Sequence, residues 1–169
     1  MLKIKMYVIL MLTFCAACNN PNSVPANTAK DSAQKGTPPP SSSTKNIIFF
    51  GNSLTAGYGL DLSEAYPALI QAKIDSLKLP YKVINAGLSG ETTAGGKSRI
   101  DWILKQPVHV FVLELGGNDG LRGIPLEETE KNLQQILDKV KEKYPAVKLM
   151  LTGMRVPPNM GKQYSENFH

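Results

Sequence analysis

Apolar residues along this chain fall into short, nearly continuous runs, separated by longer stretches in which apolar and polar positions alternate with a helical period. Short runs rich in β-branched residues predict strands of a parallel sheet whose two faces are both covered. Four segments have this pattern, at residues 46–50, 82–86, 109–115 and 147–152. They are the expected strands of the folded part.

Helical periodicity fills the intervals between the predicted strands. In residues 126–143, Leu133, Ile136, Leu137 and Val140 repeat at the spacing of one helix face, with glutamates in the first turn. Helices are predicted at 65–77, 93–105 and 126–143, with a fourth beginning near residue 159. The alternation of strands and helices predicts an α/β fold: a three-layer α/β/α arrangement with helices on both sides of a parallel sheet.

The first 17 residues have a different pattern. Lys3 and Lys5 precede an apolar stretch from Met6 to Phe14, and small residues close the segment. This is the pattern of a secretory signal peptide, and its apolar stretch is shorter than the roughly 20 residues that span a bilayer. We therefore expect residues 1–17 to direct export.

Cys18 follows this segment and is the expected site of a lipid anchor. The sequence AAC followed by NNPNS resembles a bacterial lipobox, whose cysteine becomes the acylated first residue of the mature protein. A redox or metal-binding pair with Cys15 is the alternative, but a signal peptide has no fold around it to tune a thiolate. The resemblance implies a lipoprotein of the bacterial cell envelope, held at a membrane.

Residues 18–45 lack aromatic side chains and are rich in Pro, Ser, Asn and Ala. Such a segment cannot bury enough apolar surface to offset its ordering entropy, so we expect a disordered tether ahead of a single domain at residues 46–169. No cysteine follows the tether. The net charge of the chain is +5, and loss of Lys3 and Lys5 with the leader would lower it to +3. This balance argues against a nucleic-acid partner.

Glycine-rich stretches follow three of the predicted strands. They are GNSLTAGYG from Gly51, GLSGETTAGG from Gly87 and GGNDGLRG from Gly116. The carboxyl ends of parallel strands meet at one edge of a sheet, where sites in this class of fold form. The three loops therefore predict a functional site at that edge.

A nucleotide site is one alternative for these loops. The sequence AGGKS at residues 94–98 matches the end of a P-loop, but the first glycine of that pattern would fall on Glu91. A carboxylate facing the phosphates opposes binding. A nucleotide-binding flavodoxin-like protein nevertheless stays open as an alternative.

Acyl transfer is the other chemistry that the loops can support, because it needs a nucleophile and hydrogen-bond donors for an oxyanion. Ser53 stands at the end of the first strand as a candidate nucleophile. Gly90 could offer a backbone N–H, and Asn118 a side-chain amide, from the two neighbouring strand ends.

The three stretches together resemble blocks of the SGNH (GDSL-type) hydrolases, most closely the bacterial arylesterase, thioesterase-I and lysophospholipase branch. The resemblance covers residue 46 to the end. It implies Ser53 as nucleophile, with the Ser53 and Gly90 N–H groups and the Asn118 amide as oxyanion hole. It also implies a flavodoxin-like fold, a small acyl ester or thioester substrate, no metal or organic cofactor, and a monomer. Asn52 replaces the aspartate of the usual Gly-Asp-Ser-Leu block.

The family takes its catalytic Asp and His from a late Asp-x-x-His block that this chain does not contain. Only His109 and His169 follow Ser53. His109 begins the third strand, roughly 23 Å from its carboxyl end at the rise of a β-strand, and His169 is the last residue. We therefore expect a C-terminally truncated esterase with little activity, and a non-catalytic envelope binding module is the alternative.

Three further side chains can be placed from their positions. Glu114, in the third strand, should be buried with a partner, and an ion pair with Arg155 is one possibility. Trp102 is predicted on the core face of its helix. Arg99 is predicted on a solvated helix face with its charged neighbours.

Overall fold

The computed structural model of the protein describes residues 44–155 and 161–168. The predicted signal peptide, Cys18 and all but the last residues of the predicted tether lie outside these ranges, as does His169. The expectations about them stay predictions. No helix of the described residues is long and apolar enough to cross a membrane.

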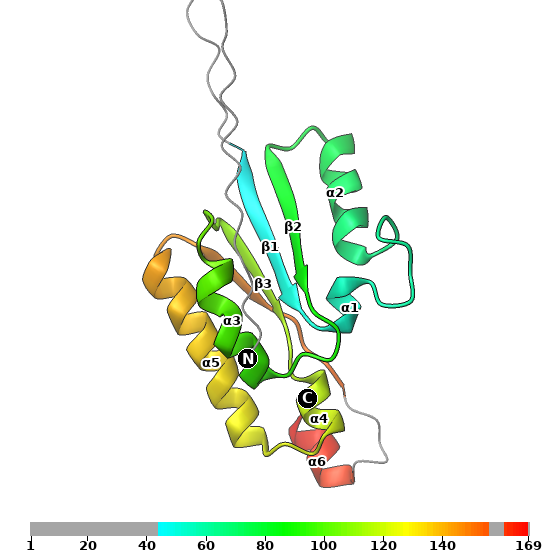
Figure 1. Ribbon diagram of the computed structural model, residues 1–169, viewed down its shortest axis with the longest axis vertical. Coiled ribbons are helices and arrows are strands. Elements are labelled where there is room, and N and C mark those ends of the chain that lie inside the picture. The colour runs from blue at the N-terminus through cyan, green and yellow to red at the C-terminus, as the bar shows by residue number, and fades with distance from the viewer. Residues whose placement is uncertain (1–43, 156–160, 169) are drawn as a thin grey trace, which may run out of the picture. The chain divides into compact units, whose positions relative to one another are not determined.

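The described residues form a four-stranded, fully parallel sheet in the order β2-β1-β3-β4 (Figure 1). The strands are β1 (Lys45–Gly51), β2 (Tyr81–Gly87), β3 (Val110–Glu114) and β4 (Lys148–Leu151). Each lies within two residues of the predicted strand. The order is that of flavodoxin-like sheets. In these sheets β2 is added on one side of β1, and the later strands are added on the other side, beginning with β3.

Six helices accompany the strands in the described part of the chain. They are α1 (Ser53–Ala56), α2 (Tyr66–Ser76), α3 (Thr93–Ile103), α4 (Gly117–Leu121), α5 (Leu126–Lys143) and α6 (Lys162–Asn167). The bounds of α5 are those predicted from its apolar stripe. The sequence analysis missed α1 and α4, because helices of four or five residues are too short to show periodicity.

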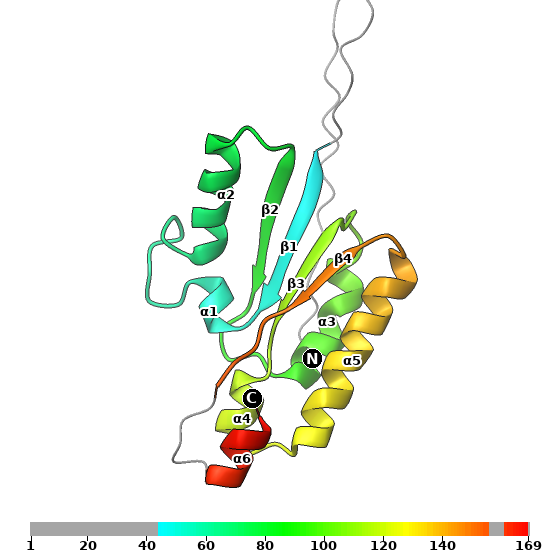
Figure 2. The same ribbon diagram turned by 180° about the vertical axis from the view of Figure 1, so that it is seen from behind.

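Alternate side chains of β1 build the two layers. Ile48 and Phe50 are fully buried in the core formed with α3 and α5, which lie together over one face of the sheet (Figures 1 and 2). Phe49 points to the other face and packs edge-on against Tyr66 of α2, with ring centroids 5.4 Å apart. Full burial of side chains of this size contributes roughly 1.5–3 kcal/mol each, so these layers hold the strand ends in place.

Gly96 allows α3 to approach the sheet closely. A Cβ atom there would lie 2.5 Å from Leu115 Cδ1 and 3.1 Å from the Phe50 ring. Residues 94–98 lie inside α3, with Thr92 as its N-cap. Gly96, the second glycine of the P-loop-like AGGKS, therefore serves the packing of α3 against the sheet.

The expectation for Trp102 was wrong, because its side chain is 67% exposed. The core positions of α3 are Ile100 and Ile103. At 3.6 residues per turn, Trp102 lies about 200° around the helix from Ile100 and faces away from the sheet.

The expectation that every strand is covered on both faces was also wrong for β4. All four of its residues are exposed, including Leu149, Met150 and Leu151. The view from behind shows no helix over this end of the sheet, because α1 and α2 lie beside β2 (Figure 2). Among the described residues, the second helical layer thus covers only the β1–β2 half of the sheet.

Candidate active site

Ser53 is the first residue of α1, two residues beyond the carboxyl end of β1. The preceding residue, Asn52, is the N-cap, and its Oδ1 accepts a hydrogen bond of 2.9 Å from the Leu54 N–H. The Ser53 hydroxyl donates to the same Oδ1 over 3.5 Å, which is a long and weak hydrogen bond. Ser53 is half-buried.

Asn52 is oriented by the buried carboxylate of Glu114. Glu114 Oε1 accepts 2.8 Å from Asn52 Nδ2, and Oε2 accepts 3.3 Å from the Asn52 N–H. Because the amide nitrogen is committed to Glu114, Oδ1 must face Leu54 and Ser53. Glu114 therefore orients Asn52, and Asn52 in turn contacts the Ser53 hydroxyl.

The same carboxylate binds a short chain of hydroxyl groups. Thr55 Oγ1 donates 2.7 Å to Glu114 Oε2 and lies 2.8 Å from the Tyr66 hydroxyl. Since Thr55 has one proton and gives it to Glu114, Tyr66 must be the donor to Thr55. Burial raises the pKa of the Tyr66 phenol, and the charge of Glu114 adds to the rise. Glu114 is thus satisfied by neutral groups, and the ion pair with Arg155 stays a prediction.

Gly90 lies in the loop between β2 and α3, at the same edge of the sheet. Its φ angle of 79° is in the left-handed region that favours glycine. The loop is tied to its neighbours by the Leu88 N–H, which donates 2.9 Å to Gly51 O, and by Arg122 Nη2, which donates 3.0 Å to Gly90 O. These bonds place the Gly90 peptide beside the loop that begins α1.

An ion pair supports the loop between β2 and α3. The carboxylate of Glu91, whose side chain is 3% exposed, is paired with Arg99. Arg99 also donates 2.7 Å to Ala86 O and lies 4.1 Å above the Phe50 ring. The expectation of a solvated Arg99 was therefore wrong, because a surface-like sequence pattern does not reveal a buried carboxylate in the preceding loop.

Asn118 lies in α4, after β3, and reaches the β2–α3 loop. Its Nδ2 donates 2.9 Å to Glu91 O, which uses one of its two N–H bonds. The neighbouring Asp119 is fully buried and binds the amino end of α3. It accepts one hydrogen bond of 2.9 Å from the Thr93 N–H and one of 2.6 Å from the Thr93 hydroxyl. These bonds fix α4, and with it Asn118, relative to α3.

The structure thus brings the loops of Ser53, Gly90 and Asn118 to one edge of the sheet. Neither the Ser53 N–H nor the Gly90 N–H donates a hydrogen bond to another described residue. Together with the second N–H of Asn118 Nδ2, they are available donors for a developing negative charge. The roles of the three residues stay predictions.

His109 lies at the other edge, as its position in the sequence predicts. Its Nδ1 accepts 3.0 Å from the Asn46 N–H, near the amino end of β1. No histidine among the described residues therefore lies beside Ser53.

The supporting network of Asn52, Thr55, Tyr66, Glu91 and Arg99 was not predicted from the sequence. The one available signal was a glutamate, Glu114, at the end of an apolar strand. A buried charge needs hydrogen-bonding partners, but the sequence does not say which residues provide them.

Residues 49–168 match the profile of the GDSL-like Lipase/Acylhydrolase family. The chain is 37% identical over 125 residues to Esterase TesA of Pseudomonas aeruginosa, covering 73% of this chain and 61% of the relative. It is 42% identical over 123 residues to Thioesterase 1/protease 1/lysophospholipase L1 of Escherichia coli K12, covering 72% of this chain and 57% of the relative. The chain thus spans about three fifths of the length of these relatives.

The fold also resembles solved structures. The crystal structure of AlinE4, described as an SGNH-hydrolase family esterase, is 41% identical and superposes with a TM-score of 0.69. The match covers 74% of this chain and 67% of that one. The parallel α/β fold predicted from the sequence is confirmed by this similarity.

Proposed function

Because the chain belongs to the GDSL-like lipase/acylhydrolase family, we propose that it carries the nucleophile and oxyanion hole of a serine esterase. The observation that carries the proposal is the convergence of Ser53, Gly90 and Asn118 at the carboxyl edge of the sheet. An alkoxide-forming side chain and several unused N–H donors at one place are what acyl transfer requires.

In the proposed reaction, Ser53 Oγ attacks the carbonyl carbon of the substrate while its proton passes to a base. The carbonyl oxygen becomes negative and accepts hydrogen bonds from the Ser53 N–H, the Gly90 N–H and Asn118 Nδ2. The carbonyl then re-forms, and the alcohol or thiol leaves with the proton. Water attacks the acylated Ser53 in the second half of the reaction and releases the acid.

The base is proposed to come from outside the described residues. The only acceptor of the Ser53 hydroxyl in the described part of the chain is the neutral Asn52 amide oxygen, which is too weak a base to take a proton. A histidine is the proposed base, because general-base catalysis by such a group typically contributes about 10²–10⁴-fold.

Small acyl esters and thioesters are the proposed substrates. The names of the two relatives, an esterase and a thioesterase that is also a lysophospholipase, support this class. The acyl carbonyl is the group that all of these substrates share, and it is the part that Gly90 and Asn118 would hold.

Export and lipid anchoring through Cys18 are proposed from the sequence alone. Expression in bacteria with an alkyne-labelled fatty acid tests this. Cys18→Ser should abolish labelling, whereas Cys15→Ser should retain it. Equal labelling of both variants would remove Cys18 as the anchor.

Chemical rescue tests the proposed site in the chain as it stands. Hydrolysis of p-nitrophenyl butyrate is measured with increasing imidazole, and the rate of Ser53→Ala is subtracted at each concentration. The remaining rate should rise with imidazole, because the added base can accept the proton of Ser53. The matched control is Ser98→Ala, which removes an exposed hydroxyl of α3 and should behave as the wild type.

Trapping by an alkyl fluorophosphonate provides the second readout. Intact mass should show one adduct on the wild type and on Ser98→Ala, and none on Ser53→Ala. An unchanged rate and adduct in Ser53→Ala would reject the proposed nucleophile. A hydrolysis rate that does not depend on imidazole, together with the absence of an adduct, would favour a non-catalytic binding module.

A further inference from the structure

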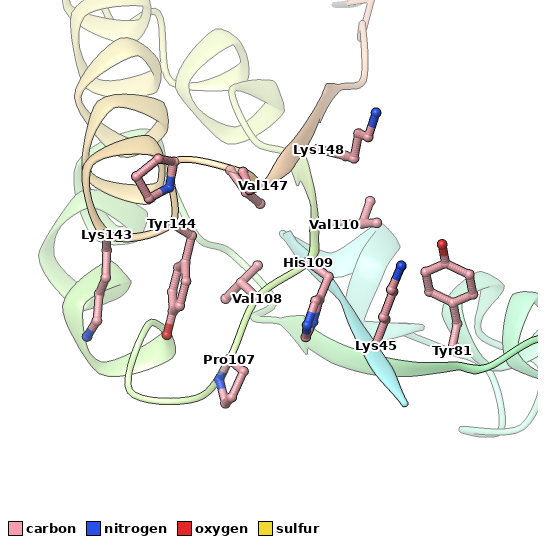
Figure 3. Close-up of a pocket in the computed structure, with 12 residues that line it drawn as sticks. Lys45, Tyr81, Pro107, Val108, His109, Val110, Lys143, Tyr144, Val147 and Lys148 are labelled. Carbon is pink, nitrogen blue, oxygen red and sulfur yellow. The ribbon is translucent and has the colours of Figure 1, made fainter. Parts of the chain in front are cut away.

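A cavity opens at the amino edge of the sheet, at the opposite end from Ser53 (Figure 3). Its volume is about 520 Å³, within the range of small-molecule sites. It lies between the first residues of the strands and the end of α5. The seven residues of β1 separate this edge from the nucleophile by about 20 Å at the rise of a β-strand.

Cationic side chains surround this cavity. Lys45 comes from the start of β1, Lys148 from the start of β4 and Lys143 from the last turn of α5. No aspartate or glutamate is among the residues that line it. The carboxyl end of α5 carries a partial negative charge of about half a unit, which three ammonium groups exceed. The cavity therefore favours an anion.

His109 adds a fixed neutral donor to the lysines. Because its Nδ1 accepts the hydrogen bond from the Asn46 N–H, the ring proton must lie on Nε2. Asn46 is itself held by its Nδ2, which donates 2.9 Å to Pro107 O. The imidazole is thus held in one tautomer at the wall of the cavity, with an N–H to offer.

The inner wall of the cavity is apolar. Val108 and Val147 are 4% and 7% exposed, and Pro107 and Pro145 lie beside them in the lining. The Tyr144 hydroxyl lies 2.7 Å from Gln106 O and 3.0 Å from Leu104 O, which share its single proton, so its ring is fixed against the same wall. Figure 3 shows the labelled side chains of this wall on one side of the cavity and those of Lys45, Tyr81 and His109 on the other.

We propose that this cavity binds an anionic amphiphile: a phosphate or carboxylate group held by Lys45, Lys148 and His109, with a short apolar chain against Val108 and Val147. A free anion would gain little from the apolar wall, and a neutral amphiphile would gain nothing from the lysines. The combination selects a ligand that has both parts. This site is separate from the proposed esterase site and does not depend on it.

Titration with octyl phosphate, followed by NMR of the histidine rings, tests the proposal. The full chain contains two histidines, so the His109 signal can be followed against that of His169 as an internal reference. The Ser53→Ala background excludes turnover. Octyl phosphate below its micelle concentration should shift the His109 ring signal in a saturable way and leave the His169 signal unchanged.

A pair of variants with equal change of charge separates the site from a general effect of basicity. Lys45→Gln/Lys148→Gln should weaken octyl phosphate binding about tenfold, as expected from removing two ion pairs of modest strength. Lys73→Gln/Lys131→Gln, which alters two exposed lysines that are not among the residues lining the cavity, should change binding less than about twofold. Equal weakening in both variants would overturn the proposal.

Two further ligands test the two parts of the proposed molecule. Octyl glucoside should not compete, and inorganic phosphate should bind much more weakly than octyl phosphate. Competition by octyl glucoside would reject the anionic part, and equal affinity for inorganic phosphate would reject the apolar part. Absence of any His109 shift up to the micelle concentration would reject the site.

Vesicles identify the source of the ligand. Sedimentation with phosphatidylglycerol vesicles but not with phosphatidylcholine vesicles, lost in Lys45→Gln/Lys148→Gln, would identify a membrane lipid. Octyl phosphate binding without vesicle binding would identify a free amphiphile. Either result supports the proposed chemistry.

Discussion

The amide nitrogen of Asn52 donates a hydrogen bond of 2.8 Å to the buried carboxylate of Glu114, 62 positions later in the chain. This bond decides which end of the Asn52 amide faces Ser53. It joins the end of β1 to the end of β3, so the position of the candidate nucleophile depends on the pairing of two strands.

Replacing Glu114 by glutamine should lower the free energy of unfolding by roughly 1–3 kcal/mol. The carboxylate accepts three hydrogen bonds, from Asn52 and Thr55, and in the variant an NH₂ group would replace one of the two accepting oxygens. Urea denaturation measures the loss. The control is Glu127→Gln, at an exposed position of α5, which should change stability by less than about 0.5 kcal/mol. Similar losses in the two variants would show that the Glu114 contacts add little.

Asn52→Asp should make stability depend on pH. It places a second carboxylate in hydrogen-bond contact with Glu114, and two carboxylates so close cannot both ionise, so the pKa of the introduced carboxyl is raised. The folded state then holds a proton that the unfolded state has already released above about pH 4. Stability is therefore lost as pH rises from about 4 through the raised folded value. Urea denaturation at a series of pH values should show this fall in the variant alone. Parallel curves for variant and wild type would contradict it.

Tyr66→Phe should change stability at alkaline pH. Burial raises the pKa of the Tyr66 phenol above its usual value of 10.0, so the contribution from the protonated phenol is complete below pH 10.0 and is lost as pH rises through the higher folded value. The variant should lose roughly 0.5–1.5 kcal/mol at neutral pH with the hydrogen bond to Thr55, and its decline at alkaline pH should be shallower. Absorbance titration of the phenols checks the direction. Tyr58→Phe, which alters an 80% exposed ring, is the control.

Arg99→Gln should destabilise the protein by roughly 3–5 kcal/mol, because it leaves the carboxylate of Glu91 buried without its cation. Lys97→Gln removes a neighbouring charge of α3 and serves as the control. Arg99→Gln should also slow fluorophosphonate labelling of Ser53, since the loop that holds Gly90 loses its support. Labelling at the wild-type rate by folded Arg99→Gln would contradict a role for the ion pair in positioning that loop.

Much of the candidate site followed from local patterns. Apolar runs and helical periodicity predicted a parallel sheet, and such a sheet collects the carboxyl ends of its strands at one edge. Ser53, Gly90 and Asn118 could therefore be assigned to that edge, and His109 to the other, before any contact was known. The apolar stripe of residues 126–143 predicted the bounds of α5, because the buried positions of one helix face repeat at a fixed interval along the chain.

The sequence by itself thus determined the layers of the fold and the edge at which the site lies, because both depend on periods that can be counted along the chain. Only the tertiary structure decided which polar groups there contact one another. Asn118 and Glu91 are 27 positions apart, and their contact depends on how closely α3 and α4 pack. The errors at Trp102 and Arg99 have the same origin: a residue type indicates what could be buried, whereas packing decides what is.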